Sequence, residues 1–319
     1  MPSEPRAIVG RLAPSPTGHL HLGHARSFLL AWWHARARGG RVVLRIEDLD
    51  VERVKPGLID ETLRDLEWLG LDWDGAPWIQ SAGVAEIQSA AEDLLARGLA
   101  YPCVCTRAEI EAAQSAPHGA DAAGRYPGTC RGRYASLAEA ERASGRKAAL
   151  RFVVREGPVP VHDELQGERT FDVAREVGDF PILRRAGSPA YQLAVVVDDA
   201  RAGVTEVVRG ADLLDSAARQ QLLQAALGLA TPRWWHVPLV TDATGRRFAK
   251  RSDDIALSRL RAAGLDPRVL VAWIARRSGI PHAEPATAHE LAPHFDLQHI
   301  PLEPVVVTPA AWSELALTP

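Results

Sequence analysis

The sequence R-L-A-P-S-P-T-G-H-L-H-L-G-H at residues 11–24 decides the fold. It follows an apolar run at residues 7–10 that is long enough for a buried strand and too short for a helix. Two prolines and a glycine then force a stiff loop, and a helix is predicted from Leu22 to the Gly39-Gly40 pair. A strand, loop and helix of this kind direct backbone N–H groups and the positive end of the helix dipole at one point, which favours phosphate.

Two histidines, His21 and His24, stand at the predicted start of this helix with Gly23 between them. At this spacing both imidazoles can face one ligand, and the glycine allows that ligand to approach the backbone closely. Two imidazoles beside a helix N-terminus suit a polyphosphate and indicate a nucleotidyl-transfer site. The alternative is a pair of surface histidines beside a turn, because the bare pattern H-x-G-H is common.

A second apolar run, at residues 41–46, ends in an acidic segment that begins with Glu47. Leucines at helical spacing predict a helix from about residue 56, and another is predicted at about residues 82–97. This alternation, with strands that are apolar throughout, indicates an α/β fold with a Rossmann-like parallel sheet covered by helices. Glu47 then follows the carboxyl end of a strand, where open α/β sheets bind ligands; the alternative is a solvated acidic turn.

Apolar strand-like runs return after residue 190. The valines at residues 195–197 predict one buried strand, and residues 207–208 predict another that ends at Arg209. Asp212 is expected to cap a helix that reaches about residue 227. An arginine at the end of a buried strand needs an anionic partner, either a local carboxylate or the carboxylate of a substrate.

Residues 101–190 differ in pattern, with short strand-like runs at residues 149–154, 159–161 and 180–183 between glycine-rich and charged turns. We predict an inserted α+β subdomain of largely antiparallel structure here. It interrupts a catalytic domain formed by residues 1–100 and 191–245, and residues 246–319 follow as a loop and a helical region. Cys103, Cys105 and Cys130 lie in the insertion and indicate a structural zinc site, with His118 or Asp121 as generic fourth ligands. The alternative is three buried, reduced thiols.

The motif S-P-T-G-x-L-H-x-G-H resembles the first signature of class I aminoacyl-tRNA synthetases, in particular the glutamyl and glutaminyl branch. The segments L-R-I-E-D-L-D, Y-Q-L-A-V-V-V-D-D and V-V-R-G-A-D-L-L resemble the same branch, so that the resemblance covers about residues 8–255. The cysteines match a Cys-x-Cys…Tyr-x3-Cys zinc site of this branch. The resemblance therefore implies Tyr126 as the fourth ligand, with His118 as the second choice.

The resemblance also implies roles for individual residues. In this branch Glu47 and Ser15 would bind the ammonium group of an amino acid. Arg11 would bind its side-chain carboxylate and Arg209 its α-carboxylate. The expected substrate-binding residues are Arg11, Ala13, Ser15, Glu47, Tyr191 and Arg209, and the expected ATP-binding residues are His21, Gly23, His24 and Lys250. Of the latter, His21, His24 and Lys250 would be catalytic.

Lys250 lies in the segment G-R-R-F-A-K-R-S at residues 245–252, whose position fits the second signature, usually Lys-Met-Ser-Lys-Ser. Arg247 and Ala249 depart from that pattern, while the second lysine is kept. A cation here would meet the charge that develops on a leaving pyrophosphate. The 69 residues after Lys250 predict short helices, one at about residues 268–277 and one that begins with a capping box at Thr287 and ends before Pro293. We expect no separate anticodon-reading domain among them.

The composition limits the kinds of partner that the chain is expected to bind. The chain has 319 residues, a net charge of −3 and 46% hydrophobic residues. Without an apolar run of about 20 residues or a leader sequence, a soluble cytoplasmic protein with no membrane partner is expected. We expect a monomer. RNA would have to be bound by local basic faces, for which the 34 arginines are better suited than the three lysines.

Together these features predict a ligase that uses ATP with Mg²⁺ to activate L-glutamate. The resemblance and the short chain imply a member of the family that transfers glutamate to queuosine in the anticodon of tRNA(Asp). Three alternatives remain open. They are a truncated glutamyl-tRNA synthetase that charges tRNA(Glu), a small-molecule nucleotidyltransferase, and an inactive RNA-binding module.

Overall fold

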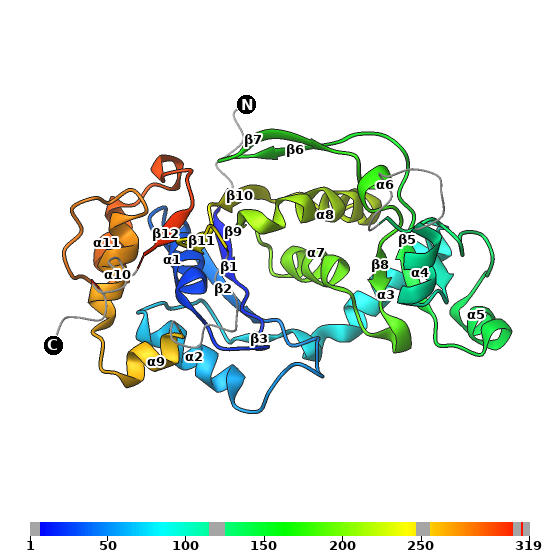
Figure 1. The fold of residues 1–319 in the computed structure, drawn as a ribbon, viewed down its shortest axis with the longest axis horizontal. Coiled ribbons are helices and arrows are strands. Elements are labelled where there is room, and N and C mark those ends of the chain that lie inside the picture. Colours follow the sequence, from blue (N-terminus) through cyan, green and yellow to red (C-terminus); the bar gives the residue numbers. More distant parts are fainter. Residues whose placement is uncertain (1–6, 115–124, 247–255, 309–313, 315–319) are drawn as a thin grey trace.

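The computed structural model describes residues 7–114, 125–246, 256–308 and 314 (Figure 1). Its amino-terminal part is a parallel sheet in which helices connect the strands. In order, the elements are β1 (Val9–Leu12), α1 (Leu22–Arg36), β2 (Arg41–Ile46), α2 (Leu58–Trp68) and β3 (Trp78–Ile79). Strand β2 lies between the other two, with Arg11 opposite Val43 and Ile46 opposite Ile79. The predicted parallel sheet and the helix that begins at Leu22 are confirmed.

Strand β9 (Glu206–Gly210) lies beside β1, on the side away from β2 (Figure 1). The backbone N–H of Thr205 donates to the carbonyl of Val9 at 2.9 Å, and the Thr205 hydroxyl accepts from the N–H of Val9 at 2.8 Å. Strand β10 (Arg233–Val237) pairs with β9 in parallel, and α8 (Leu214–Leu227) connects the two. The predicted strand that ends at Arg209 is confirmed. Segments some 200 residues apart in the sequence therefore end at one edge of the sheet.

The region between the two halves of this sheet is mixed, as predicted. Strands β4 (Ala100–Cys103), β5 (Ala149–Phe152) and β8 (Pro181–Leu183) form an antiparallel sheet. The hairpin of β6 (Val159–Asp163) and β7 (Gly167–Phe171) instead extends the sheet of β9 and β10, where Asp163 pairs with Trp234. The helices of this region are α3 (Val84–Ala96), α4 (Arg107–Gln114), α5 (Leu137–Ser144) and α6 (Val173–Glu176).

The predicted strand at residues 195–197 is wrong, because these residues belong to helix α7 (Tyr191–Arg201). All residues from 192 to 199 are buried. A helix that is buried on every side lacks the polar face by which a helical period is recognised, so its run of valines resembles a buried strand. The helix brings Tyr191 to the same region that the strand was expected to reach.

The predicted helix cap at Asp212 is also wrong. A single 3₁₀ turn, Ala211–Leu213, connects β9 to α8 and contains Asp212. The residue that precedes α8 is Leu213, whose side chain makes no capping hydrogen bond. The predicted end of this helix near residue 227 is confirmed.

The carboxyl-terminal region packs against α1 and α2. It contains β11 (Val240–Asp242), α9 (Leu257–Ala262), α10 (Pro267–Arg276), α11 (Ala288–Leu291) and β12 (Val305–Val307), with β11 and β12 paired in parallel. The predicted capping box is present, since Thr287 accepts from the N–H of Glu290, and Glu290 in turn accepts from the N–H of Thr287. In the part of the chain that the structure describes, no helix has the length and apolar character needed to cross a bilayer.

Helix α1 lies inside the molecule, with 10 of its 15 residues buried. The indole of Trp32 donates to the carbonyl of Asp72 at 2.9 Å, and that of Trp33 donates to the carbonyl of Ala288 at 2.8 Å. These bonds join the helix to the chain after α2 on one side and to α11 on the other. The amino terminus of α1, with its two histidines, is thereby held in a fixed position at the edge of the sheet.

Candidate active site

A cavity of about 430 Å³ opens where the carboxyl ends of β1, β2 and β9 meet the amino terminus of α1. All described residues that the sequence predicted to bind the amino acid or ATP line this one cavity. They are Arg11, Ala13, Ser15, His21, Gly23, His24, Glu47, Tyr191 and Arg209. The cavity volume is within the range of sites for small ligands.

His21 and His24 together form a capping box at the amino terminus of helix α1. The Nδ1 atom of His21 accepts from the backbone N–H of Gly23 at 3.1 Å, and the Nδ1 atom of His24 accepts from the N–H of His21 at 3.2 Å. Because both Nδ1 atoms act as acceptors, each neutral ring carries its proton on Nε2. The two rings lie 3.8 Å apart between centroids. Gly23 leaves room for this pair, since an added Cβ would lie 3.1 Å from Cε1 of His21.

A chain of buried charges runs along the strand ends. Arg45 donates to Asp199 at 2.5 Å and to Oε1 of Glu47 at 2.9 Å, and Arg11 lies 3.8 Å from Asp199. Burial opposes the charged form of Arg45, but the two carboxylates raise its pKa overall. The other oxygen of Glu47, Oε2, accepts from the hydroxyl of Ser15 at 3.4 Å. Glu47 is therefore anchored by one oxygen and presents the other to the cavity.

Arg209 is bound differently. Its Nε donates to Nε2 of His236 at 2.9 Å, and its two Nη atoms donate to the Gln220 side chain at 2.8 Å and to the carbonyl of Leu213 at 3.2 Å. Burial lowers the pKa of this arginine. Among the described residues, none of its hydrogen-bond acceptors is a carboxylate. Of the two partners that the sequence left open for Arg209, a local carboxylate is thus not found in the described chain.

Residues 7–303 match the family described as tRNA synthetases class I (E and Q), catalytic domain. The chain belongs to this family. It is 46% identical over 308 residues to the Glutamyl-Q tRNA(Asp) synthetase of Symbiobacterium thermophilum, and this alignment covers 93% of this chain and 95% of that protein. It is 44% identical over 322 residues to the protein of the same name from Rhodopirellula baltica, and this alignment covers 94% of this chain and 97% of the relative.

The fold of this synthetase family is also found in solved structures. A glutamate tRNA ligase from Elizabethkingia meningosepticum, crystallised with its amino acid, superposes with a TM-score of 0.82 at 24% identity. The match covers 96% of this chain and 68% of that one. At this identity the likeness shows the fold alone. That fold is the α/β fold of the class I catalytic domain that the family match gives, with a mixed, mainly parallel sheet.

Two site residues were missed by the sequence analysis, namely Arg45 and Asp199. Both interrupt or end an apolar run, and a buried charge within such a run is a signal that a partner lies nearby. Lys250, which was predicted to be catalytic, lies outside the described residues together with Arg247 and Ala249. The roles of the residues around the cavity stay predictions.

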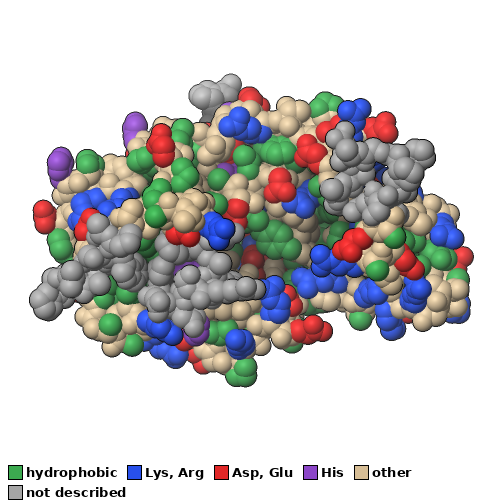
Figure 2. All heavy atoms as spheres, viewed as in Figure 1, with side chains coloured by type: hydrophobic (Ala, Val, Ile, Leu, Met, Phe, Trp, Pro, Cys, Tyr) green, Lys and Arg blue, Asp and Glu red, His purple; other side chains and the backbone are tan. Residues whose placement is uncertain are grey.

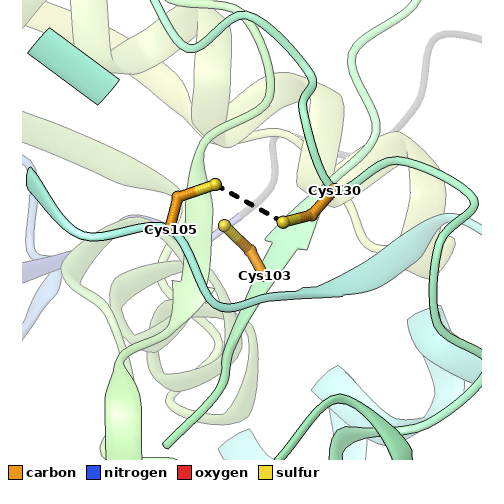
Figure 3. A group of neighbouring side chains, drawn as sticks. All are labelled: Cys103, Cys105 and Cys130. Atoms are coloured by element: carbon orange, nitrogen blue, oxygen red, sulfur yellow. Dashed lines mark hydrogen bonds between the residues drawn. The ribbon is translucent and has the colours of Figure 1, made fainter. Parts of the chain in front are cut away.

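The three cysteines of the insertion lie together, with their sulfur atoms within 4.8 Å of one another (Figure 3). Sγ of Cys105 is 3.4 Å from Sγ of Cys130, and the hydroxyl of Tyr126 is 3.3 Å from Sγ of Cys103 and 3.5 Å from that of Cys105. Burial raises the pKa of Cys105 to about 12. His118 and Asp121 lie outside the described residues. The four atoms form a compact donor set within a small cluster of buried side chains.

The capping role of His21 can be tested by two substitutions. His21→Ala should lower the free energy of unfolding by about 0.5–2 kcal/mol, because the N–H of Gly23 loses its acceptor. His21→Asn should change it by only a few tenths of a kcal/mol, because asparagine is a preferred N-cap residue. Urea unfolding followed by circular dichroism measures both. Equal losses in the two variants would contradict the capping role.

Proposed function

We propose that this chain activates L-glutamate with ATP and then transfers the glutamyl group to queuosine in the anticodon of tRNA(Asp). The observation that carries the proposal is the single cavity that joins a helix N-terminus suited to phosphate with two buried arginines and an anchored glutamate. The full-length relatives named Glutamyl-Q tRNA(Asp) synthetase support the choice of RNA.

In the activation step the α-carboxylate of glutamate attacks the α-phosphorus of ATP. A P–O bond forms to give glutamyl-adenylate, and the bond to the leaving pyrophosphate breaks. The nucleophile is already an anion, so no general base and no covalent enzyme intermediate are required. The protein has to bring two anions together and stabilise the charge that moves onto pyrophosphate.

The buried charges fit the three ionic groups of glutamate. Oε2 of Glu47, together with the Ser15 hydroxyl, would accept from the ammonium group, since Oε1 is already engaged by Arg45. Arg11 would bind the side-chain carboxylate and Arg209 the α-carboxylate. Arginine pairs with a carboxylate through two parallel hydrogen bonds, and a neutral amide cannot reproduce both, which favours glutamate over glutamine.

The amino terminus of α1 would hold the phosphates of ATP. The Nε2–H groups of His21 and His24 are donors that suit phosphate oxygens, and the helix dipole adds positive potential at the same place. Lys250 would meet the charge on the leaving pyrophosphate, and Mg²⁺ would be bound with ATP. Because the rings use Nδ1 to cap the helix, phosphate binding would not disturb the cap.

Binding of tRNA would rest on arginines rather than on the net charge of −3. Figure 2 shows several Lys and Arg side chains, with some Asp and Glu among them, over the right-hand part of the face, where α4 and α5 lie in Figure 1. Such a local basic face can contact the phosphates of a short single strand on a helical stem. The binding of tRNA should therefore weaken steeply as the salt concentration rises.

The activation step is tested by pyrophosphate exchange with different amino acids. Exchange should depend on L-glutamate, and Lys250→Ala should lower its rate by roughly 10²–10³ because it removes one electrostatic stabiliser. Lys147→Ala, a substitution of an exposed lysine in the insertion, is the matched control and should leave the rate unchanged. His21→Asn, which keeps the cap, should be slow as well.

Two results would overturn the amino-acid assignment. Faster exchange with glutamine would mean that the arginines do not select a second carboxylate. No exchange with any amino acid would favour a small-molecule nucleotidyltransferase or an inactive RNA-binding module.

The transfer step is tested with tRNA(Asp) prepared with and without queuosine. We expect labelled glutamate to appear in tRNA(Asp) only when queuosine is present, and tRNA(Glu) to be charged little. The measurement is acid-precipitable label at a fixed, stated salt concentration. Equal labelling of both tRNA(Asp) forms, or preference for tRNA(Glu), would favour a truncated glutamyl-tRNA synthetase.

We further propose that Cys103, Cys105, Cys130 and Tyr126 hold one structural zinc ion. Thiolates about 2.3 Å from a tetrahedral zinc lie about 3.8 Å from one another, and the observed separation of 3.4 Å between Cys105 and Cys130 is close to this value. The ion would stabilise the subdomain and take no part in the activation step. A zinc ion held by four protein ligands has no open position for a substrate, as is usual for a structural zinc site.

Metal analysis should find about one zinc per chain, and Tyr126→Phe should lower the affinity for zinc because a ligand is lost. Tyr134→Phe is the matched control, since Tyr134 packs against the same cluster without being a proposed ligand. Substantially less than one zinc in the metal-replete protein would contradict the site. Full affinity in Tyr126→Phe would assign the fourth position to His118.

A further inference from the structure

Strand β10 carries a fully buried histidine, His236, directly opposite Arg209 on β9. Nε2 of His236 accepts from Nε of Arg209 at 2.9 Å. Nδ1 of the same ring lies 2.6 Å from Oδ2 of Asp163, which is also fully buried and ends β6. The three side chains form a continuous hydrogen-bonded chain, Asp163–His236–Arg209, that leads from the interior to the wall of the cavity.

The direction of every hydrogen bond in this chain follows from chemistry. A guanidinium has only donors, so Nε2 of His236 must carry a lone pair. The proton of the neutral ring is then on Nδ1 and is donated to Asp163. A second proton on Nε2 would break the bond to Arg209 and place two cations in contact. Burial lowers the pKa of His236, although Asp163 opposes this, and the ring stays neutral.

Asp163 is held as an anion by four donors. Oδ1 accepts from the backbone N–H groups of Leu165 and Gln166 at 3.0 and 2.7 Å, and Oδ2 accepts from the backbone N–H and the ring of His236. Burial acts to raise the pKa of Asp163, but these hydrogen bonds lower it overall. The negative charge of Asp163 is thus fixed one imidazole ring away from the positive charge of Arg209.

Arg209 keeps donors for a ligand. Its guanidinium has five N–H groups, of which three are used by His236, Gln220 and Leu213 within the described structure. Its side chain lines the cavity. A carboxylate in direct contact with Arg209 would have to be displaced by an incoming carboxylate, whereas a neutral imidazole does not compete for that site.

We propose that His236, oriented by Asp163, is a positioning residue that fixes the Arg209 guanidinium and leaves its remaining donors for the carboxylate of the amino-acid substrate. This role rests on the proposed function, because it assigns the cavity to an amino acid. The imidazole acts as a spacer through which the negative charge of Asp163 balances the charge of Arg209 without occupying its remaining donors. His236 itself does not touch the reacting atoms.

The role is tested by the kinetics of glutamate-dependent pyrophosphate exchange. His236→Phe should raise KM for glutamate by roughly tenfold or more and leave KM for ATP within about twofold, because only the carboxylate site loses its orientation. His236→Gln, whose amide oxygen can accept from Arg209, should recover part of the loss. His34→Phe is the matched control, because His34 is also buried and packs on the neighbouring Trp235, yet belongs to a different hydrogen-bond pair with Glu206.

An equal rise in KM for glutamate and ATP, or no change in either, would overturn the positioning role. A second measurement does not depend on activity. In nitrogen-15 NMR of the histidine rings, His236 should show the Nδ1–H tautomer and no titration between about pH 5.5 and 8.5, where ordinary histidines titrate. Titration of the His236 ring in this range would overturn the hydrogen-bonded chain Asp163–His236–Arg209 but not the proposed function. Absence of glutamate-dependent exchange in the wild-type protein would overturn the proposed function, whatever the ring shows.

Discussion

Burying positive charge at the end of a parallel sheet is the constraint on which the rest of this structure depends. Arg11, Arg45 and Arg209 are all buried where β1, β2 and β9 end. A buried arginine without compensation is strongly destabilising, and removing one partner of a buried pair typically costs about 3–5 kcal/mol. The molecule meets this constraint with Glu47 and Asp199 for Arg45, and with Asp163 through His236 for Arg209.

The two ways of balancing the charge of a buried arginine have different consequences. Arg45 contacts two carboxylates directly, so that its charge is balanced and its side chain becomes a fixed part of the wall. Arg209 contacts neutral acceptors within the described residues, so that its charge remains effective toward the cavity. A site built in this way can be both stable without a ligand and attractive to an anion. This requires partners from β6, β10 and α8, which explains why the hairpin of the insertion region is joined to the main sheet.

The sequence predicted the parts of the fold that depend on local signals. Strand β2 was predicted to the residue, and the capping box at Thr287 was found, because strand runs and helix caps are local signals. Helix α7 was not predicted, because burial on all sides removes the alternation of polar and apolar residues by which a helix is recognised. His236 and Asp163 could not be paired either, because they are 73 residues apart in the sequence and meet only through the register of β6, β10 and β9.

The same contrast explains why the resemblance of motifs was a better guide to the cavity than the predicted elements were. The run that follows Tyr191 was predicted to contain a strand and is a helix with Tyr191 in its first turn, yet Tyr191 lines the cavity as expected. A ligand site constrains where a side chain ends in space, and more than one backbone element can bring it there. The supporting residues are constrained differently, because His236 must pair with both Asp163 and Arg209. They depend on the sheet order itself, and the structure is therefore needed to find them.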